Sequence, residues 1–341
     1  MRGCIHIMLL FMPLLAFGQD VHFSQFYSSP LTLNTAETGF FRQDYRVGAN
    51  LKQQWPWAQE DKKYNYLTYS FFSDAALFEG KLLDKKDWIG IGGVFVNDYA
   101  GDGRLSVVKA GLNVAYHKVL AEGRFSISLG FGATYVQKYI DFEALYFDKQ
   151  WSGLFFDLTA PTGEPQISES FGYFDFSTGI SISGLIADRY GLSFGASFLH
   201  LNKPSESFFN YDNQLGIRPA FTLKGLIPIS KNSHFEPSML YMNQKNAQEI
   251  ITNLLYAYRV KGDGTYNSTY LLVGVSYRVN DAMIPLLGLE YKRFRFLANY
   301  DINLSSLTTA SQAIGGFEMS LVYTGYRRKS TRSVKIPCPS L

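Results

Sequence analysis

The chain is poor in cysteine, has little net charge and lacks long apolar runs beyond its first residues. Cys4 and Cys338 are the only cysteines among 341 residues, which excludes a disulfide-rich scaffold and a cysteine-based zinc site. The formal net charge of +3 at pH 7 argues against binding nucleic acid through a strongly basic surface. After the first residues no apolar run reaches the length of about 18 residues expected of a transmembrane helix, which excludes a helical membrane protein.

The first residues have the features of a secretory signal peptide. Arg2 supplies a positive start, residues 5–17 are almost entirely apolar, and Ala16 and Gly18 are the small residues expected before a cleavage site. This apolar run is shorter than the roughly 20 residues that span a bilayer as a helix. We therefore expect residues 1–18 to be removed from an exported protein.

Aromatic residues are abundant, at 16 %, and the chain has 30 glycines. Between residues 124 and 139, large apolar residues such as Leu129 and Phe131 alternate with small or polar ones such as Ser128 and Gly130. Successive side chains of a strand point to opposite faces, so this segment is a strand with one apolar face and one small, polar face. If the polar face lines an open lumen, Arg at position 128 should be tolerated better than Arg at position 129.

The same alternation predicts fourteen strands, many of about ten residues, which is the length that a tilted strand needs to cross a bilayer. Only a closed sheet satisfies all backbone groups in lipid. We therefore predict an all-β fold, a transmembrane antiparallel β-barrel over residues 44–324; a secreted soluble all-β protein is the alternative. The predicted strands are 44–52, 64–75, 88–96, 105–119, 124–139, 171–183, 190–200, 217–227, 235–242, 249–260, 269–279, 282–291, 294–302 and 313–324.

Two segments flank the predicted barrel. Residues 19–43 are rich in Phe, Tyr and Asn, and we interpret them as a plug of the lumen or a partner-binding segment, with an unstructured leader as the third possibility. Residues 325–341 form a basic tail, which we place in the periplasm because an even number of strands returns both ends to one side. After signal cleavage Cys338 has no partner in the chain, so it is available for an interchain disulfide. The basic residues of the tail are Arg327, Arg328, Lys329, Arg332 and Lys335.

The longest predicted connection, residues 140–170, is unusually apolar for a loop. Exposed apolar clusters commonly mark partner sites, so we hypothesise that this loop contacts a secreted client outside the cell; the alternative is that it folds inward and plugs the barrel. The first, third, fifth and seventh connections are long, at about 11, 8, 31 and 16 residues, which is expected of outward loops. The large apolar residues of the loop include Tyr146, Phe147, Trp151, Phe155 and Phe156.

No motif indicates catalysis, a cofactor or a metal. Residues 191–195 match G-x-S-x-G, but that chemistry needs a sharp turn between a strand and a helix, and Ser193 falls within an alternating strand. His117 and His200 lie near predicted strand ends, and we interpret them as polar residues of the barrel rim. We predict a protein that is not an enzyme, has no cofactor or metal and has no nucleic-acid partner.

Several motifs identify a family. Residues 19–27 (QDVHFSQFY) are similar to an opening of the form QDPxFSQ, with Val21 in place of Pro, and residues 34–39 (NTAETG) are similar to an N-P-A-x-x-G run, with Thr35 in place of Pro. The end, Cys338-Pro339-Ser340-Leu341, is similar to C-P-R-F without its Arg and Phe. In these motifs the chain resembles the PorP/SprF family, outer-membrane proteins associated with the type IX secretion system of Bacteroidota.

The resemblance implies a role in secretion or cell-surface attachment of client proteins such as adhesins, including those used in gliding motility. The implied partners are a secreted surface protein, type IX secretion components and outer-membrane lipid. An outer-membrane diffusion channel or hydrophobic-solute transporter is the alternative function. Our candidate partner-binding residues are Phe23, Phe26, Tyr27, Tyr146, Phe147, Trp151, Phe155, Phe156, Arg327, Arg328, Lys329 and Cys338.

Overall fold

A computed structural model describes most of the chain beyond its first residues. The predicted signal peptide, residues 1–18, lies outside the described residues, as do Arg327, Arg328, Lys329 and Cys338 of the tail. No described helix is long and apolar enough to cross a membrane. The described residues are 20–55, 66–79, 82, 86–101, 103–163, 168–187, 189–208, 213–245, 247–262, 267–305 and 314–326.

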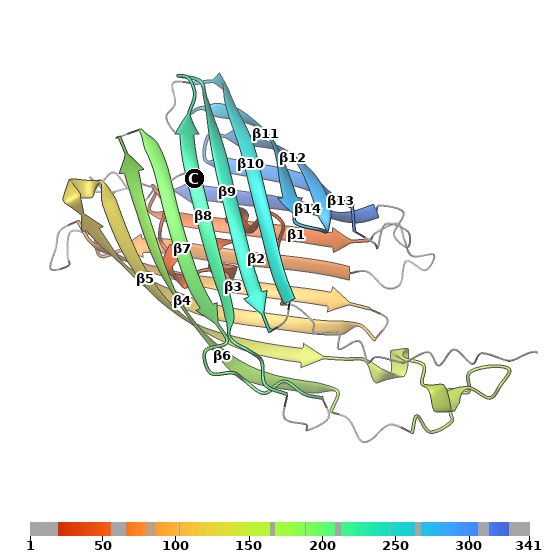
Figure 1. The fold of residues 1–341 in the computed structure, drawn as a ribbon. Helices are drawn as coiled ribbons and strands as arrows, with labels where there is room; N and C mark the ends of the chain where they lie inside the picture. Colours follow the sequence, from red (N-terminus) through yellow and green to blue (C-terminus); the bar gives the residue numbers. More distant parts are fainter. Residues whose placement is uncertain are drawn as a thin grey trace, which may run out of the picture.

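The described residues form a closed antiparallel barrel of fourteen strands, in which each strand pairs with its neighbours in sequence and β14 pairs with β1 (Figure 1). All fourteen predicted strands are present, each within four residues of its predicted ends. The strands are β1 (Tyr45–Gln54), β2 (Tyr66–Leu77), β3 (Trp88–Ala100), β4 (Leu105–Leu120), β5 (Phe125–Tyr139), β6 (Ser170–Ile186), β7 (Tyr190–Leu199), β8 (Arg218–Pro228), β9 (Ser233–Gln244), β10 (Ala247–Lys261), β11 (Thr269–Arg278), β12 (Ala282–Tyr291), β13 (Phe294–Asn303) and β14 (Ile314–Gly325).

The two ends of the barrel differ in their connections. The long-loop end has connections 55–65, 101–104, 140–169, 200–217, 245–246, 279–281 and 304–313. The short-turn end has connections 78–87, 121–124, 187–189, 229–232, 262–268 and 292–293, together with the start of β1 and the end of β14. The third connection, residues 101–104, is shorter than predicted because β3 continues to Ala100. In outer-membrane barrels long loops face outward and short turns face the periplasm.

The predicted alternation of faces is confirmed. On β5, Leu129 is 61 % exposed on the outer surface, whereas Ser128 is 1 % exposed on the inner one. Phe131 is also exposed, and the outward side chains of the other strands are largely apolar. The barrel therefore presents an apolar belt, as a lipid-facing surface requires.

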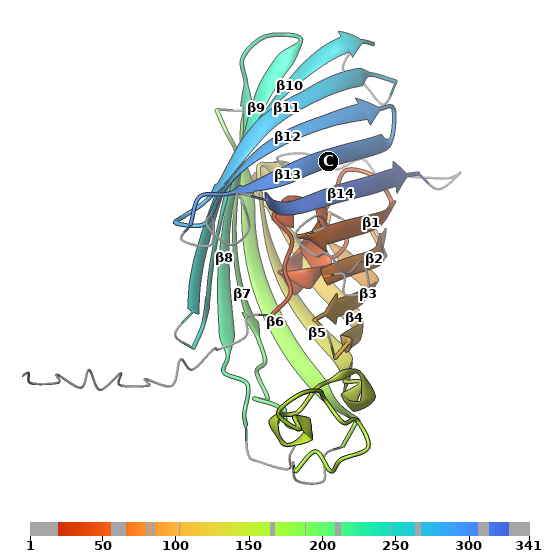
Figure 2. The ribbon, with the colours of Figure 1, turned by 90° about the vertical axis from the view of Figure 1, so that its right-hand side faces the viewer.

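The lumen is occupied by the residues that precede β1. We call residues 20–44 the lumen segment; it enters at the long-loop end, where Asp20 lies 3.0 Å from His200, and leaves at the short-turn end, where β1 begins. Figure 2 shows its turns, in red, inside the barrel. It contains three short 3-10 turns, η1 (Phe26–Ser28), η2 (Pro30–Thr32) and η3 (Thr35–Glu37). The other described 3-10 turns are η4 (Ala121–Gly123), η5 (Phe142–Ala144) and η6 (Asp148–Gln150).

Glycines on the inner wall make room for this segment. A Cβ added to Gly130 would lie 2.3 Å from the carbonyl carbon of Thr35, and one added to Gly179 would lie 2.0 Å from Oδ1 of Asn34. These distances are too short for any side chain, so the glycines allow the two backbones to approach closely. The condition for tolerating Arg at position 128, an open lumen, is not met, because Ser128 is buried against His117.

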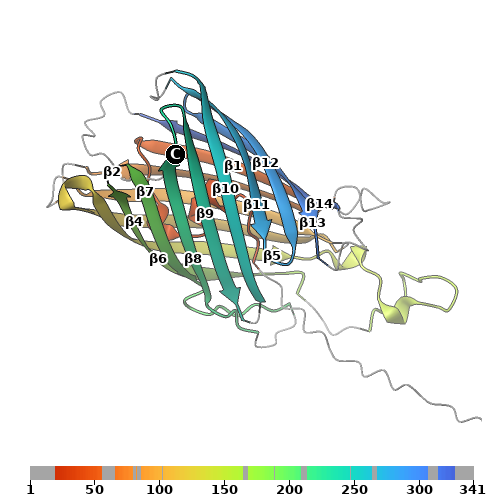
Figure 3. The same ribbon diagram turned by 45° about the horizontal axis from the view of Figure 1, so that its top comes forward.

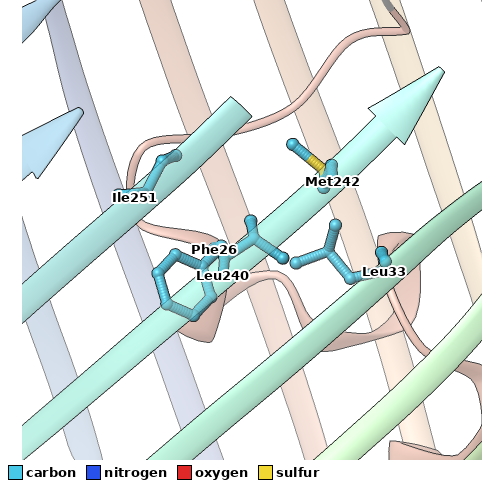
Figure 4. Packing of buried hydrophobic residues seen from close by; sticks show 6 residues of the cluster. Phe26, Leu33, Leu240, Met242 and Ile251 are labelled. Atoms are coloured by element: carbon cyan, nitrogen blue, oxygen red, sulfur yellow. The ribbon is translucent and has the colours of Figure 1, made fainter. Parts of the chain in front are cut away.

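An apolar cluster holds the first part of the lumen segment against the wall. Phe26 and Leu33 pack against Leu240, Met242 and Ile251 on the inner faces of β9 and β10 (Figure 4). Phe26 is 1 % exposed, and burial of such a side chain stabilises a fold by about 1.5–3 kcal/mol. The inner wall is therefore not uniformly polar: it has an apolar pocket where the segment presents apolar side chains.

The glycine contacts predict a specific effect of one added methyl group. Gly130→Ala should lower the free energy of unfolding by about 1–3 kcal/mol, because the methyl group overlaps the backbone of the lumen segment. Gly93→Ala is the matched control, since its Cβ would have no neighbour nearer than 3.6 Å. Urea unfolding of both variants, refolded in lipid vesicles, measures the effect. Equal stability of the two variants would contradict the close packing of Thr35 on β5.

Candidate functional site

The opening motif of the lumen segment is bound by one carboxylate of the wall. The backbone N–H groups of Ser24 and Gln25 donate to the two carboxylate oxygens of Glu318, at 2.9 and 3.1 Å. The Gln25 side chain donates to Oδ1 of Asn299 at 3.0 Å and accepts from the Ser320 hydroxyl at 2.6 Å. All five residues are buried. The Phe-Ser-Gln sequence thus matches a preformed set of groups on β13 and β14.

The second motif of the segment is anchored on the opposite wall. Asn34 caps η3 by accepting from the N–H of Ala36 at 2.9 Å, while its amide donates to the carbonyl of Ile180 on β6 at 3.2 Å. The carbonyl of Leu33 accepts from the Ser197 hydroxyl on β7 at 2.6 Å. One asparagine therefore both shapes the turn and attaches it to the barrel.

A buried ion pair of the wall binds the last part of the lumen segment. Arg46 on β1 donates to both oxygens of Asp74 on β2, at 3.0 and 2.8 Å, and also to the carbonyl of Glu37 at 3.3 Å. Asp74 accepts in addition from the N–H of Gly39 at 2.7 Å. The Arg46 guanidinium lies over the Phe41 ring, 4.8 Å from its centroid. Because these groups are shielded from water, each charge depends on its partner.

His117 lies in the core of this arrangement and not at the barrel rim. It is fully buried, its ring stacks on Trp88 with centroids 4.6 Å apart, and Phe40 stacks within 5.6 Å. Its Nε2 donates to the carbonyl of Thr38 at 2.7 Å, and its Nδ1 accepts from the Ser128 hydroxyl at 2.7 Å. The predicted rim position is wrong because the lumen segment covers this part of the wall.

His200 directly follows β7 at the long-loop end, as predicted for a residue of the barrel rim, but its side chain is buried there. It lies 3.0 Å from the carboxylates of both Asp20 and Asp175. Burial alone would lower the pKa of His200, but hydrogen bonds and attraction from these two carboxylates raise it above the ordinary value. Burial would raise the pKa of Asp20, but Lys109, His200 and Arg218 hold it well below the usual range. Lys109 and Arg218 lie 3.0 and 3.5 Å from the Asp20 carboxylate.

The predicted aromatic candidates fall in two separate places. Phe23 and Phe26 are buried in the lumen, and Tyr27 packs beside them with its ring 5.4 Å from that of Phe26. Phe26 and Tyr27 pack against apolar residues of the barrel wall. The polar residues of the same segment, above all Gln25 and Asn34, were not among our candidates, although their place in the family-like motifs was the available signal.

The loop candidates lie outside the barrel. The loop between β5 and β6 projects beyond the long-loop end (Figures 1 and 2) and does not fold into the lumen. Trp151 forms a β-bridge with Phe156, whose ring lies 4.9 Å from Trp151 and 5.1 Å from Tyr146. Tyr146, Trp151, Phe155 and Phe156 are exposed, whereas Phe147 is half-buried. The loop thus holds an aromatic hairpin in solvent.

Cavities remain at both ends of the lumen. The cavity at the short-turn end, the short-turn mouth, has a volume of about 410 Å³, and the cavity at the long-loop end, the long-loop mouth, one of about 300 Å³. Among the described residues no group of three or more His, Cys, Asp or Glu is placed to hold a metal ion. Ser193 lies within β7, where its hydroxyl contacts Ser183 at 2.7 Å, so it does not occupy a turn between a strand and a helix.

The buried ion pair predicts a large effect of a small substitution. Asp74→Asn should destabilise the folded barrel by about 3–5 kcal/mol, because Arg46 keeps its charge in a buried site and loses its partner. Asp141→Asn is the matched control: its partner Arg104 is 55 % exposed and 3.6 Å away, and such pairs contribute about 1 kcal/mol or less. Urea unfolding in lipid vesicles measures both. Equal losses would show that the Arg46 pair has no special role.

The pKa shifts of His200 and Asp20 predict how pH affects the entrance of the lumen segment. Protonated His200 stabilises the folded state below its ordinary pKa of about 6.5, and this contribution is lost as pH rises through the raised folded value. The Asp20 contribution is present above about pH 4 and is lost as pH falls through its lowered value. Unfolding should therefore become easier above neutral pH. His200→Gln should remove most of that alkaline decline, and an unchanged decline in this variant would contradict the assignment.

Comparison with solved structures finds barrels of the same fold. The TodX monoaromatic hydrocarbon channel, as its deltaS2 mutant, has a TM-score of 0.52 at 10 % identity, covering 88 % of this chain and 94 % of that one. The toluene transporter TbuX of Ralstonia pickettii has a TM-score of 0.49 at 8 % identity, covering 88 % and 94 %. A FadL homologue of Pseudomonas aeruginosa has 0.47 at 11 %, covering 85 % and 92 %. At 10 % identity, the match to the TodX channel shows the fold alone. No curated protein matches the chain.

A family model matches most of the chain. It covers residues 15–323, which include the lumen segment and all strands but the last residues of β14. The predicted resemblance, made from the motifs at residues 19–27 and 34–39, is thereby confirmed. The fold and the family are those of an outer-membrane barrel and not those of known enzymes. The chain belongs to the family of the type IX secretion system membrane protein PorP/SprF.

Proposed function

We propose that the protein is a non-enzymatic barrel that helps type IX secretion deliver a client protein, such as an adhesin, to the cell surface or retain it there. The observation that carries this proposal is the lumen segment, which fills the barrel and is hydrogen-bonded to its wall through Ser24, Asn34 and Gly39. A barrel whose lumen is filled in this way acts on partners through the residues that it exposes outside the lumen. Gliding motility is one process that such a client would serve.

The chemistry of the lumen favours this role over that of a solute channel. Partly buried ion pairs connect the lumen segment to the wall, among them Glu37 with Lys224 at 2.6 Å and Asp20 with Lys109 at 3.0 Å. An apolar solute that crossed the lumen would have to separate these charged groups from one another. A charge that is shielded from water and loses its partner is strongly unfavourable. The alternative of a hydrophobic-solute transporter therefore has no supporting contact in the described lumen.

The aromatic hairpin of the β5–β6 loop is the part of the surface best suited to a client. Leu154 at its tip is 87 % exposed and Phe155 is 63 % exposed. Large aromatic side chains dominate the energy of many protein interfaces, and exposing them to water has a cost that binding relieves. We propose that Tyr146, Trp151, Phe155 and their neighbours contact the secreted client outside the cell.

The proposal also assigns a role to each end of the chain. Residues 1–18 are proposed to direct export and to be removed, and the basic tail, residues 325–341, is proposed to extend into the periplasm. There its five Lys and Arg residues would raise the rate of association with a negatively charged component. Cys338 would then be available to a partner in an oxidising compartment.

Removing the aromatic hairpin tests the proposed client contact. Deletion of residues 145–156 should leave the barrel assembled, because these residues lie outside the strands, and should abolish retention of the client at the cell surface. A double substitution in the same loop, Asp148→Ser with Lys149→Ser, is the control that changes charge but keeps the aromatic residues. Surface proteins are compared by mass spectrometry after mild protease release, and barrel level by its folded band on unboiled gels.

Two results would contradict the proposal. One is an unchanged set of surface proteins in the deletion strain at normal barrel level. The other is rapid flux of small solutes through the purified barrel in liposomes, at a rate that rises with solute hydrophobicity, since this would support the transporter. Co-purification of a secreted surface protein with the intact barrel, lost in the deletion and kept in the control, is the expected outcome.

A further inference from the structure

The short-turn mouth is rich in positive charge. Its lining includes Arg42 of the lumen segment, Lys231 of the β8–β9 turn, and Lys292 and Arg293 of the β12–β13 turn, all four of them exposed. The buried Arg295 lies deeper. These cations come from three separate parts of the chain, so the fold gathers them around one cavity. Its volume of about 410 Å³ is within the range of about 300–1,000 Å³ typical of ligand sites.

The two carboxylates of the cavity already have partners. Glu236 pairs with Arg295 at 2.5 Å and with His234 at 3.0 Å. Glu290 lies 3.9 Å from Arg295. Among the described residues, none of the four exposed cations forms an ion pair with a carboxylate. Lys292 and Arg293 lie over the rings of Tyr291 and Tyr326, at 5.1 and 5.3 Å from the ring centroids. These rings do not neutralise the cations, so their charge is available to a carboxylate.

The opposite mouth has the opposite character. Four carboxylates line the long-loop mouth, against the two cations Lys52 and Arg278. The connections follow the same trend: by sequence, those of the long-loop end contain twelve acidic and six basic residues, whereas those of the short-turn end contain six acidic and eight basic residues. The four acidic residues of the long-loop mouth are Asp20, Asp98, Glu249 and Asp281.

The sequence that follows β14 is basic. Thr324 at the end of β14 lines the cavity, and the five basic residues of the tail follow within eleven residues, with no acidic residue among them. Clustered Lys and Arg residues attract a negatively charged partner and speed its association. A mouth that bears exposed cations is complementary to a chain of carboxylates.

We propose that the short-turn mouth binds an acidic peptide segment of a periplasmic partner, with carboxylates of that segment paired to Arg42, Lys231, Lys292 and Arg293. The periplasmic location of this partner rests on the proposed function; the binding of acidic peptide does not. A peptide fits better than a lipid headgroup because the cavity that these cations line reaches the buried inner-wall residues Glu236 and Arg295. Because the four exposed cations come from two turns and the lumen segment, a segment with several carboxylates could pair with more than one of them.

The test compares two variants with the same change in net charge. Lys231→Glu with Arg293→Glu reverses two cations of the short-turn mouth; Lys149→Glu with Lys203→Glu reverses two cations of long-loop connections. The full barrel is purified in detergent, its folding is checked by gel mobility without boiling, and binding of a fluorescent oligoglutamate peptide is measured by anisotropy. We expect the mouth variant to bind about tenfold more weakly or worse and the control to bind like the parent. Binding should also weaken with added salt.

Each outcome decides for or against the peptide site. Equal loss in both variants means attraction by net charge alone and overturns the proposal, as does equal binding by both variants. Displacement of the peptide by inorganic phosphate, beyond that by sodium chloride at equal ionic strength, would identify a phosphate site and overturn it as well. Client retention is measured separately, so peptide binding that persists while deletion of residues 145–156 leaves retention unchanged would reject the proposed function and keep this site.

Discussion

Buried charges on the inner wall need partners, and the lumen segment supplies them. Lys224, Lys109 and Arg218 point into the barrel and would be unpaired there without the carboxylates of Glu37 and Asp20. An isolated charge in such a site is strongly unfavourable. The wall and the segment therefore depend on each other: the barrel gives the segment its conformation, and the segment neutralises the barrel. Figure 3 shows this segment enclosed between strands on both sides.

The contacts between wall and lumen segment also explain residues of the inner wall that would have no role in an empty barrel. Gly90 and Gly130 leave no space for a Cβ because the backbone of the lumen segment lies against them. Glu318 accepts two backbone N–H groups from Ser24 and Gln25 that no strand could satisfy. Unpaired backbone donors are costly in a buried place. Small and acidic residues on the inner face thus make intramolecular contacts with the lumen segment.

Local periodicity was enough to predict the strands, because an apolar outer face in lipid imposes strict alternation on each strand. It was not enough for His117 and His200. Both have the spacing of inward, polar residues, but their partners Thr38 and Asp20 lie 79 and 180 residues away in sequence. The alternation of apolar and polar residues along one strand does not indicate which distant segment of the chain will contact its inner face. The motif residues Gln25 and Asn34 were visible as a family resemblance, yet only the folded contacts explain why those amides are there.

The filled lumen changes how the two ends of the molecule can be related. Besides the strands, the described part of the chain that reaches both mouths is the lumen segment: Asp20 and His22 line the long-loop mouth, and Arg42 and Gln43 line the short-turn mouth. Any displacement of this segment must break ion pairs at both ends, because Asp20, Glu37 and the Gly39 backbone are each bound to the wall. A displacement that began at one mouth would therefore be opposed by contacts along the whole lumen segment, from Asp20 at one end to Gly39 near the other.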